Sequence, residues 1–406
     1  MKKVLAGLGL VLIAASIAAF VYRDTINQLY QLAYLFDEES IVHNFQNMDE
    51  IFPTSPIEGG GKVIEFERGS YTLPTSFEFN GKTFDSEQYL ADTMATGLLI
   101  LHKDKIIYEE YWHGHSAEGT HIAWSVSKSF LSALFGIAVA EGHIKDIMQP
   151  VTDYVPELAG SGYDGVPIKH VLQMSSGVGF NEDYGDPDSD INRMGESMAM
   201  GDSLLEFSAT LKRARPPGTL QHYVSIDTQV LGTVLVRATG KELSDYTSEK
   251  LWKPLGMESE AYWMVDGSGM GMAFGGLNVS LRDFMRLGRL YLHKGNWFGE
   301  QIISEGWVHD SVTPDAPHLM PGKKPDTENS LGYGYQWWLP QDWIGDYMAL
   351  GVYDQMIYVD PNRDLVIARH AANRDFQRNN FEPTDENVAL FRAIAEDLST
   401  NAAPQP

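Results

Sequence analysis

Along this chain the pattern of hydrophobic residues changes more than once, between runs typical of β-strands and patterns typical of helices. Near residue 100 the apolar run Gly97–His102 is followed by a Lys-Asp-Lys turn and a second run, Ile106–Trp112, which predicts a β-hairpin. From Ser125 to about Glu141 the apolar residues instead surround the segment on every side, a pattern typical of a fully buried helix. Gly142 is expected to end that helix.

Residues 147–265 show mainly helical patterns separated by long loops, and strands return after them. Ser280 and Asp283 form a capping box that predicts a helix through Leu292. Four strand-like segments and a closing amphipathic helix then follow, at Tyr335–Leu339, Tyr347–Leu350, Met356–Asp360, Leu365–His370 and Val388–Leu398. This order predicts an α/β fold in which both ends of the chain build one antiparallel sheet, with residues 147–265 as a helical insertion.

The N-terminus carries the signature of a membrane segment. Two lysines precede an uncharged run, Val4–Tyr22, which Arg23 ends. At about 1.5 Å per residue this run nearly matches the roughly 30 Å hydrocarbon core of a bilayer, so residues 1–23 are predicted to contact the lipid as an uncleaved anchor. The alternative is a signal peptide whose removal leaves a secreted or periplasmic protein, but the small-residue site at 16–18 lies inside the apolar run.

Residues 24–85 are expected to form a stalk and an extended approach to a catalytic domain at 86–400. Apolar residues up to Phe36 recur at roughly helical spacing. Residues 51–83 are rich in proline, glycine and serine, which favours irregular structure.

Composition narrows the chemistry. The 406-residue chain has a formal net charge of −25 and no cysteine. Such an acidic protein lacks the basic footprint of a nucleic-acid-binding surface, so no nucleic-acid partner is expected. Without cysteine, disulfides, thiolate catalysis and cysteine-ligated zinc are all excluded.

The tetrapeptide Ser125-Val126-Ser127-Lys128 places a serine and a lysine on one face of the predicted helix. A serine hydroxyl needs a base, and a lysine among apolar residues can be that base because desolvation disfavours the ammonium. Free N–H groups at the helix start suit a developing oxyanion. Ser125 is therefore the candidate nucleophile, whereas Ser127 points away from Lys128. The alternative is a helix-capping serine beside a surface lysine.

A second candidate element is Tyr223-Val224-Ser225, which follows a Pro-Pro-Gly turn and precedes a helix that Ser225 can cap. The Tyr223 phenol is placed to pass protons between the serine and a leaving group, particularly beside an ammonium that lowers its pKa. A packed aromatic side chain is the alternative reading of Tyr223.

Together these motifs resemble the serine β-lactamase and penicillin-recognising superfamily, and most closely its class C-like branch of β-lactamase-related esterases and 6-aminohexanoate-dimer hydrolases. Three further matches lie in the expected order: Leu-Gln-Met-Ser-Ser-Gly at 172–177, Leu-Trp-Lys-Pro-Leu-Gly-Met at 251–257 and Gly-Gly-Leu-Asn at 275–278. The resemblance implies a β-lactamase-like fold, an α/β sandwich beside an all-helical domain, with the site in the cleft between them. It also implies that Ser125 is acylated while Lys128 and Tyr223 handle protons.

The resemblance implies a third motif on an edge strand facing the serine. Its best candidate is Ala349-Leu350-Gly351, on the strand that leads to Asp354 and Gln355. The family's motif begins with a cation that grips a substrate carboxylate. Alanine stands there instead, so lactam antibiotics and peptide C-termini are expected to be poorer substrates, unless a nearby arginine at 213 or 215 replaces the cation.

Five residues are predicted to contact the substrate on the strength of this resemblance: Tyr184, Ser225, Ala349, Gly351 and Gln355. Tyr184 belongs to a loop that resembles the substrate-covering loop of the dimer hydrolases.

Three histidines near one end of the hairpin, His113, His115 and His121, raise the question of a metal. No H-E-x-x-H pattern and no clear carboxylate partner accompany them, so solvated histidines are expected, with no metal and no cofactor.

The sequence thus predicts a membrane-anchored serine hydrolase that cleaves a small-molecule amide or ester through an acyl-enzyme. A penicillin-binding or peptidase activity on cell-wall peptides is one alternative. A catalytically silent binding protein of the same fold is another, and the joint presence of Ser125, Lys128 and Tyr223 argues against it.

The charge around the N-terminal segment predicts its orientation. Lys2 and Lys3 should remain in the cytoplasm and the catalytic part should face the periplasm or the exterior. A C-terminal reporter that works only in the periplasm should therefore be active. Sequencing the N-terminus of the mature protein checks the anchor, because a mature chain that begins near Ala19 would show a cleaved signal peptide.

Overall fold

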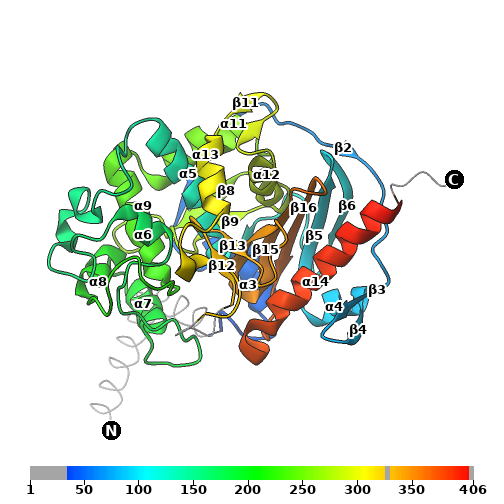
Figure 1. Cartoon of the computed structure of the whole chain (residues 1–406), viewed down its shortest axis with the longest axis horizontal. Coiled ribbons are helices and arrows are strands. Elements are labelled where there is room, and N and C mark those ends of the chain that lie inside the picture. Colours follow the sequence, from blue (N-terminus) through cyan, green and yellow to red (C-terminus); the bar gives the residue numbers. More distant parts are fainter. Residues whose placement is uncertain (1–33, 325–329, 402–406) are drawn as a thin grey trace, which may run out of the picture.

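An eight-stranded sheet forms the centre of the structure, a computed structural model that describes residues 34–324 and 330–401 (Figure 1). From edge to edge its strands are β12 (Gly332–Tyr333), β13 (Trp338–Leu339), β14 (Tyr347–Gly351), β15 (Gln355–Asp360), β16 (Leu365–Ala371), β5 (Ala95–His102), β6 (Lys105–Tyr111) and β2 (Glu67–Arg68). Neighbouring strands are antiparallel except β2 and β6. Because β16 pairs with β5, both ends of the chain build the sheet, and the predicted architecture and hairpin are confirmed.

The two faces of this sheet pack against different helices, because successive residues of a strand point to opposite sides. Leu98 of β5 belongs to the core beneath the closing helix α14 (Arg378–Asn401), whereas Leu99 belongs to the core that includes α12 (Leu281–Leu292). Gly288 lets α12 approach closely, since a Cβ there would lie 2.6 Å from side-chain atoms of β15 and β16. Figure 1 shows α14 and α12 on opposite faces of the sheet.

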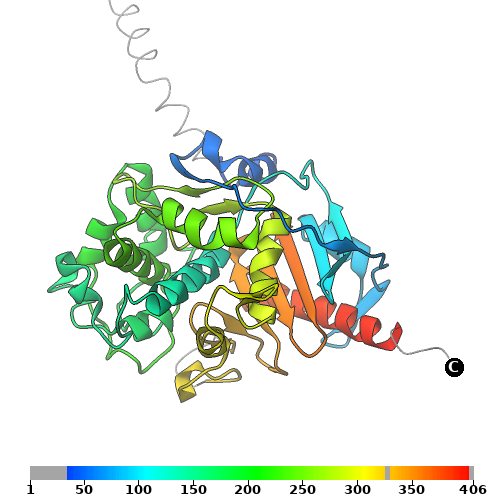
Figure 2. The same cartoon turned by 90° about the horizontal axis from the view of Figure 1, so that it is seen from above.

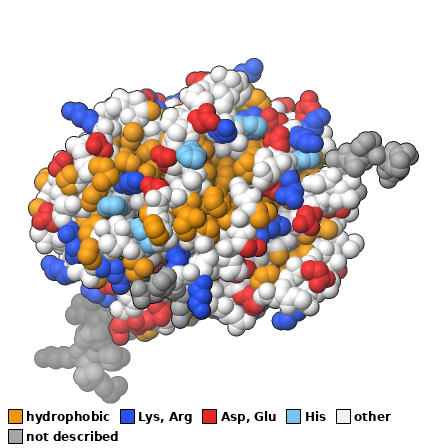
Figure 3. Space-filling view, in the orientation of Figure 1, with side chains coloured by type: hydrophobic (Ala, Val, Ile, Leu, Met, Phe, Trp, Pro, Cys, Tyr) orange, Lys and Arg blue, Asp and Glu red, His pale blue; other side chains and the backbone are white. Residues whose placement is uncertain are grey.

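A helical region stands beside the sheet, and helix α5 (Ser127–Ala140) connects the two (Figures 1 and 2). Every residue of α5 from Ser127 to Ala138 is buried, which confirms the prediction of a helix without a solvent face. The region contains α6 (Ile168–Leu172), α7 (Asp190–Ala199), α8 (Leu204–Thr210), α9 (Ser225–Thr239) and α10 (Leu243–Thr247). Hydrophobic side chains gather near the middle of the molecular face in Figure 3, where this region meets the sheet.

A second, four-stranded sheet fixes the chain just before the predicted nucleophile. Its order is β1 (Thr54–Ile57), β8 (Ala261–Met264), β9 (Leu277–Val279) and β7 (His121–Ile122). Strand β7 leads within three residues to Ser125, so its pairing with β9 sets where α5 begins. The shorter elements are β3 (Ser76–Phe79), β4 (Lys82–Asp85), α4 (Ser86–Asp92), α11 (Lys253–Leu255), β10 (Asn296–Trp297), β11 (Glu300–Gln301) and α13 (Glu305–Val312).

The stalk prediction is corrected from residue 34 onward, because this part of the chain packs against the catalytic domain, whereas the irregular approach that was predicted next has no helix or strand over 58–66 and 69–75. Helix α3 (Ile41–Gln46) has only six residues and buries Ile41 and Phe45 against the core. Strand β1 belongs to the four-stranded sheet, and β2 is an edge strand of the eight-stranded sheet. Phe36, the last residue of the apolar spacing, is 43% exposed and lies before α3, and the spacing before residue 34 lies outside the described residues. The predicted membrane segment, residues 1–23, and the start of the stalk lie outside the described residues. Within the part of the chain that is described, no helix is long and apolar enough to cross a bilayer.

Local sequence signals had mixed success at element boundaries. The Ser280 hydroxyl accepts from the Asp283 amide and caps α12, as predicted. The strand predicted from Tyr335 is shortened to β13, because Gln336 has a positive φ and the Gly334 amide donates to the Trp337 carbonyl in a turn. Helix α9 has Val224 as its cap residue, so Ser225 lies inside the helix and does not cap it.

Candidate active site

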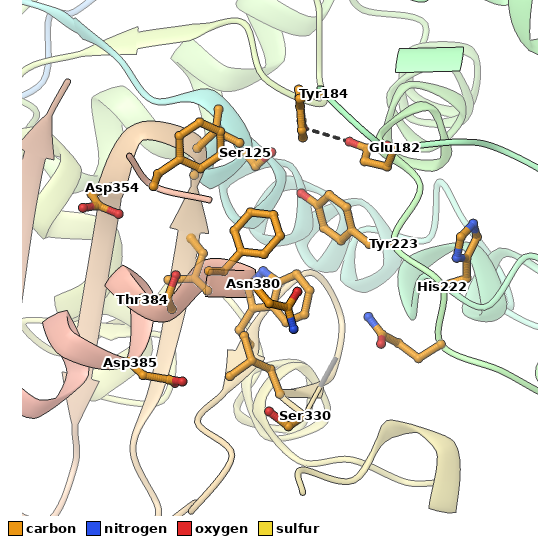
Figure 4. Close-up of a pocket in the computed structure, with 18 residues that line it drawn as sticks. Ser125, Glu182, Tyr184, His222, Tyr223, Ser330, Asp354, Asn380, Thr384 and Asp385 are labelled. Atoms are coloured by element: carbon orange, nitrogen blue, oxygen red, sulfur yellow. Dashed lines mark hydrogen bonds between the residues drawn. The ribbon is translucent and has the colours of Figure 1, made fainter. Parts of the chain in front are cut away.

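Ser125 lies at the wall of a cavity of about 370 Å³ between the helical region and the sheet (Figure 4). It sits in a single 3-10 turn, Trp124–Val126, directly before α5. The preceding Trp124 has a left-handed φ of 43°, a conformation that costs a non-glycine residue about 1–3 kcal/mol. Its ring packs edge-on against Phe45 at 5.4 Å between centroids, so the aromatic core holds the strained turn in place.

The Lys128 amine lies immediately beside Ser125. Its Nζ donates to Ser125 Oγ at 2.8 Å, to Ser225 Oγ at 3.2 Å and to the Phe274 carbonyl at 2.6 Å. The side chain is only 1% exposed. Burial lowers the pKa of Lys128 to about 7, although the negative charge of Glu182 opposes part of that change. The expected serine–lysine pair is thus assembled around an amine that loses its proton readily.

Tyr223 closes the other side of the Lys128 amine. The Nζ lies 5.0 Å from the centroid of the phenol ring, and that ring stacks on Trp338 at 5.3 Å. Burial, followed by the charge of Glu182, raises the pKa of Tyr223, while hydrogen bonding with Ser125 and Ser225 lowers it slightly. The expectation of a lowered pKa was therefore wrong, and Tyr223 remains a neutral phenol that can donate a proton.

Ser225 lies behind this pair and does not line the cavity. Its hydroxyl accepts from Lys128 Nζ and donates to Glu182 Oε1 at 2.5 Å. The prediction that Ser225 contacts the substrate is not supported, because the first turn of α9 buries this side chain against Lys128. Its position instead connects the lysine to a carboxylate.

That carboxylate, Glu182, is the residue that sequence reasoning missed. Its Oε2 accepts from the Ser225 amide at 2.9 Å, and its Oε1 also accepts from the Tyr184 hydroxyl at 3.0 Å. Both Glu182 and Tyr184 line the cavity, and Figure 4 shows them bonded to each other beside Tyr223. Tyr184 is therefore at the site, as predicted, on a loop that is held by Glu182.

The strand predicted to carry the third motif, β14, does lie against Ser125. Gly351 lines the cavity, and a Cβ on it would lie 2.7 Å from the Ala123 carbonyl and 3.2 Å from the Ser125 amide nitrogen. Only glycine leaves that amide uncrowded. Leu350 and Val352 line the cavity with it.

Two predictions on this strand and the next are corrected. Ala349 is fully buried and its side chain belongs to the core, because it alternates with Leu350 along the strand. Gln355 is also fully buried. Its amide donates to the Tyr353 carbonyl at 3.1 Å and accepts from the Ala371 amide at 3.2 Å, so it stabilises backbone and does not face the cavity.

Ser127, the rival nucleophile, is turned away. Its hydroxyl accepts from the Leu277 amide at 3.1 Å, and the side chain is fully buried outside the cavity lining.

The charged side chains in the lining are all acidic: Glu182, Asp354 and Asp385. In the described part of the chain no lysine or arginine lines the cavity. Arg213 donates to the carbonyls of residues 162 and 164, and Arg215 is likewise absent from the lining, so neither replaces the missing cation.

The histidines were expected to be solvated, and for two of the three this is wrong. His115 and His121 are buried and cluster with His370, the rings of His121 and His370 stacking at 4.6 Å. Burial lowers the pKa of His115 to about 4 and of His121 to about 3, so both are neutral near pH 7. Among the described residues, no group of three or more histidine, cysteine, aspartate or glutamate side chains is arranged to hold a metal ion.

Comparisons with known proteins agree with this geometry. A model of the Beta-lactamase family matches residues 87–391. A 6-aminohexanoate-dimer hydrolase from Paenarthrobacter ureafaciens is 32% identical over 367 residues, covering 87% of this chain and 91% of the relative.

Two solved structures show the same fold. A Bacillus anthracis protein with a provisional 6-aminohexanoate-dimer hydrolase name has a TM-score of 0.81 at 23% identity, covering 91% of this chain and 97% of its own. A D-stereospecific amidohydrolase from Streptomyces sp. has a TM-score of 0.54 at 16% identity, covering 70% of this chain and 92% of its own. Since the family match spans most of the sequence and the Paenarthrobacter relative aligns along nearly all of its length, this chain belongs to the Beta-lactamase family of hydrolases.

Proposed function

We propose that this chain cleaves an amide or ester bond through an acyl-enzyme on Ser125. The observation that carries the proposal is the buried Lys128 amine, whose Nζ lies 2.8 Å from Ser125 Oγ and whose pKa is lowered to about 7. Near neutral pH a large share of this amine is uncharged, so its lone pair can accept the serine proton.

In the proposed reaction Lys128 accepts a proton when a nucleophile attacks and returns it when a bond breaks. Ser125 Oγ attacks the substrate carbonyl carbon while Lys128 takes the hydroxyl proton. The charge that develops on the carbonyl oxygen is stabilised by the Ser125 amide, beside Gly351. The bond to the leaving group then breaks, and the leaving group receives a proton from Lys128 through the neutral Tyr223 phenol. Water then attacks the carbonyl carbon of the acyl ester while Lys128 takes a proton from the water through Tyr223. The bond to Ser125 Oγ breaks, Lys128 returns the proton to that oxygen, and the acid is released.

The cavity walls favour a flexible, apolar acyl chain over a carboxylate-bearing ring. Leu331, Leu350 and Trp338 line the cavity, and its charged residues are acidic. The Paenarthrobacter relative, named for a dimer of 6-aminohexanoate, supports an amide between aliphatic units as one substrate class.

We also propose that residues 1–23 tether the enzyme to a bilayer. Residues 24–33 would then be the link to the folded domain, which the structure describes from Tyr34 onward. Ten residues reach at most about 35 Å when fully extended, so the tether would keep the domain close to the membrane surface.

The nucleophile assignment is tested by labelling. Ser125→Ala should abolish labelling by a fluorophosphonate and turnover of short acyl esters, while unfolding remains cooperative. Ser127→Ala, which removes the neighbouring hydroxyl outside the cavity, should still be labelled. Mass spectrometry of the labelled wild-type protein should place the adduct on Ser125, and an adduct on any other serine contradicts the assignment.

The lysine's role predicts a pH profile. Because Lys128 must be neutral to act as a base, kcat/KM for a nitrophenyl ester should rise as pH increases through about 7 and then level off. Lys128→Arg keeps a charge that is not lost in this range, and should reduce kcat/KM by about a hundredfold or more. A wild-type profile that is flat between pH 5 and 9 would show that another group is the base.

Among the residues that the structure describes, no lysine or arginine lines the cavity, and this predicts how the enzyme responds to lactams. Benzylpenicillin should acylate the enzyme no faster than its own methyl ester, as measured by the loss of fluorophosphonate labelling. An enzyme built to grip the carboxylate would instead prefer the free acid by roughly ten- to a hundredfold. That opposite result would favour the penicillin-binding alternative.

A further inference from the structure

Two turns that contain left-handed residues meet beside Ser125. In the turn Trp124–Val126, Trp124 has a φ of 43°, and in the turn that joins β14 to β15, Tyr353 and Asp354 have φ angles of 61° and 65°. Figure 4 shows Asp354 at the Ser125 end of the cavity. The rings of Trp124 and Tyr353 lie 6.2 Å apart between centroids, so the two turns are packed together. Residues other than glycine seldom adopt this conformation, and surrounding contacts must hold them in it.

The Tyr353 ring joins these turns to the cavity wall. It packs on Phe376, which lines the cavity, at 4.6 Å between centroids, and face to face on Phe36 at 5.5 Å. Phe45 packs edge-on against the same ring at 5.0 Å. Tyr353 itself does not line the cavity, although the residues on either side of it do. Its contacts therefore hold the nucleophile turn and the cavity wall in one arrangement.

Two of these rings come from the N-terminal segment, before the family match at 87–391. Besides stacking on Tyr353, Phe36 approaches the nucleophile turn directly, with its ring 6.0 Å from that of Trp124. The same segment reaches the loop that carries Phe376, because Glu38 accepts from Arg374 at 3.2 Å. A segment outside the family match therefore contributes packing around Ser125.

We propose that Phe36 is a positioning residue, which holds Tyr353 and through it the Trp124 turn in the arrangement that acylation of Ser125 requires. The inference rests on the proposed function, because acylation is the step that it affects. Trp124 directly precedes Ser125, so a change in its backbone moves both the serine hydroxyl and the serine amide. A displacement of about 1 Å in such groups can cost about a hundredfold in rate.

The rate at which a fluorophosphonate labels Ser125 tests this role, because labelling reports acylation alone. Phe36 is 43% exposed, so Phe36→Ala in the full-length protein should fold normally. Its second-order labelling rate should fall about tenfold or more, while the midpoint of the pH profile stays at about 7, since the contacts of Lys128 are unchanged. Phe36→Tyr keeps the ring and should restore the rate. A Phe36→Ala rate within about twofold of the wild-type rate overturns the proposal.

A matched variant separates positioning from a general loss of stability. Phe298 is another aromatic residue with a half-exposed side chain, at 51%, and it packs on Trp297 at 5.3 Å outside the cavity lining. Phe298→Ala should lower the unfolding temperature as much as Phe36→Ala does, or more, and leave the labelling rate unchanged. Equal slowing in the two variants would overturn the proposal.

The route through Tyr353 predicts effects that do not add. Tyr353→Leu should slow labelling by itself, and Phe36→Ala should slow it little further in that background. If the two losses multiply in the double variant, Phe36 does not act through Tyr353.

Hydrogen exchange tests the positioning separately from the chemistry. In Phe36→Ala the amides of residues 123–126 should exchange about tenfold faster than in the wild-type protein, whereas in Phe298→Ala they should exchange at the wild-type rate. Unchanged exchange in Phe36→Ala overturns the proposal. Faster exchange together with a wild-type Ser125 that is never labelled would support the positioning and contradict only the hydrolase mechanism.

Discussion

The lowered pKa of a buried amine is the constraint on which this site depends. An ammonium held away from water needs an acceptor for each of its three hydrogens, and Lys128 finds them on Ser125, Ser225 and the Phe274 carbonyl. All three acceptors are neutral. Glu182 accepts a hydrogen bond from Ser225 and not from the amine, so it raises the pKa of Lys128 only through its charge at a distance. A carboxylate in direct contact would hold the proton on the lysine and, in the proposed mechanism, leave Ser125 without a base.

The fold delivers these groups from separate parts of the chain. Helix α5, with Ser125 in the turn directly before it, carries Lys128 through the middle of the molecule, where burial on all sides supplies the low polarity that the lysine needs. Helix α9 brings Ser225 beside it, and β14 brings Gly351 against the serine amide from the sheet. The site therefore exists only while the helical region and the sheet stay packed together.

The part of this arrangement that could be predicted from the sequence is the part with local signals. The apolar pattern of α5, the apolar run of β5 and the spacing of Ser125 and Lys128 each concern residues that are close together in the sequence. The role of Glu182 depends on a contact with a helix 43 residues further along, and nothing local separates it from the acidic residues around it. The motif on β14 led to the strand that lies against Ser125 and to Gly351, which lines the cavity, but Ala349 packs in the core and the neighbouring Leu350 lines the cavity instead.

The order of strands in the sheet also governs when the protein becomes active during its synthesis. β5 is made early, but its partner β16 lies more than half the chain away, and pairing across such a separation is slow. Until β16 is made, β5, which is buried along nearly its whole length in the finished protein, has only β6 beside it and offers an apolar edge to other chains. The part of the cavity wall formed by residues 380–385 is made later still, because these residues follow β16 in the chain. A ribosome-bound chain thus carries its serine and lysine long before it has a site, and a chaperone that covers β5 during that interval would protect the protein from aggregation.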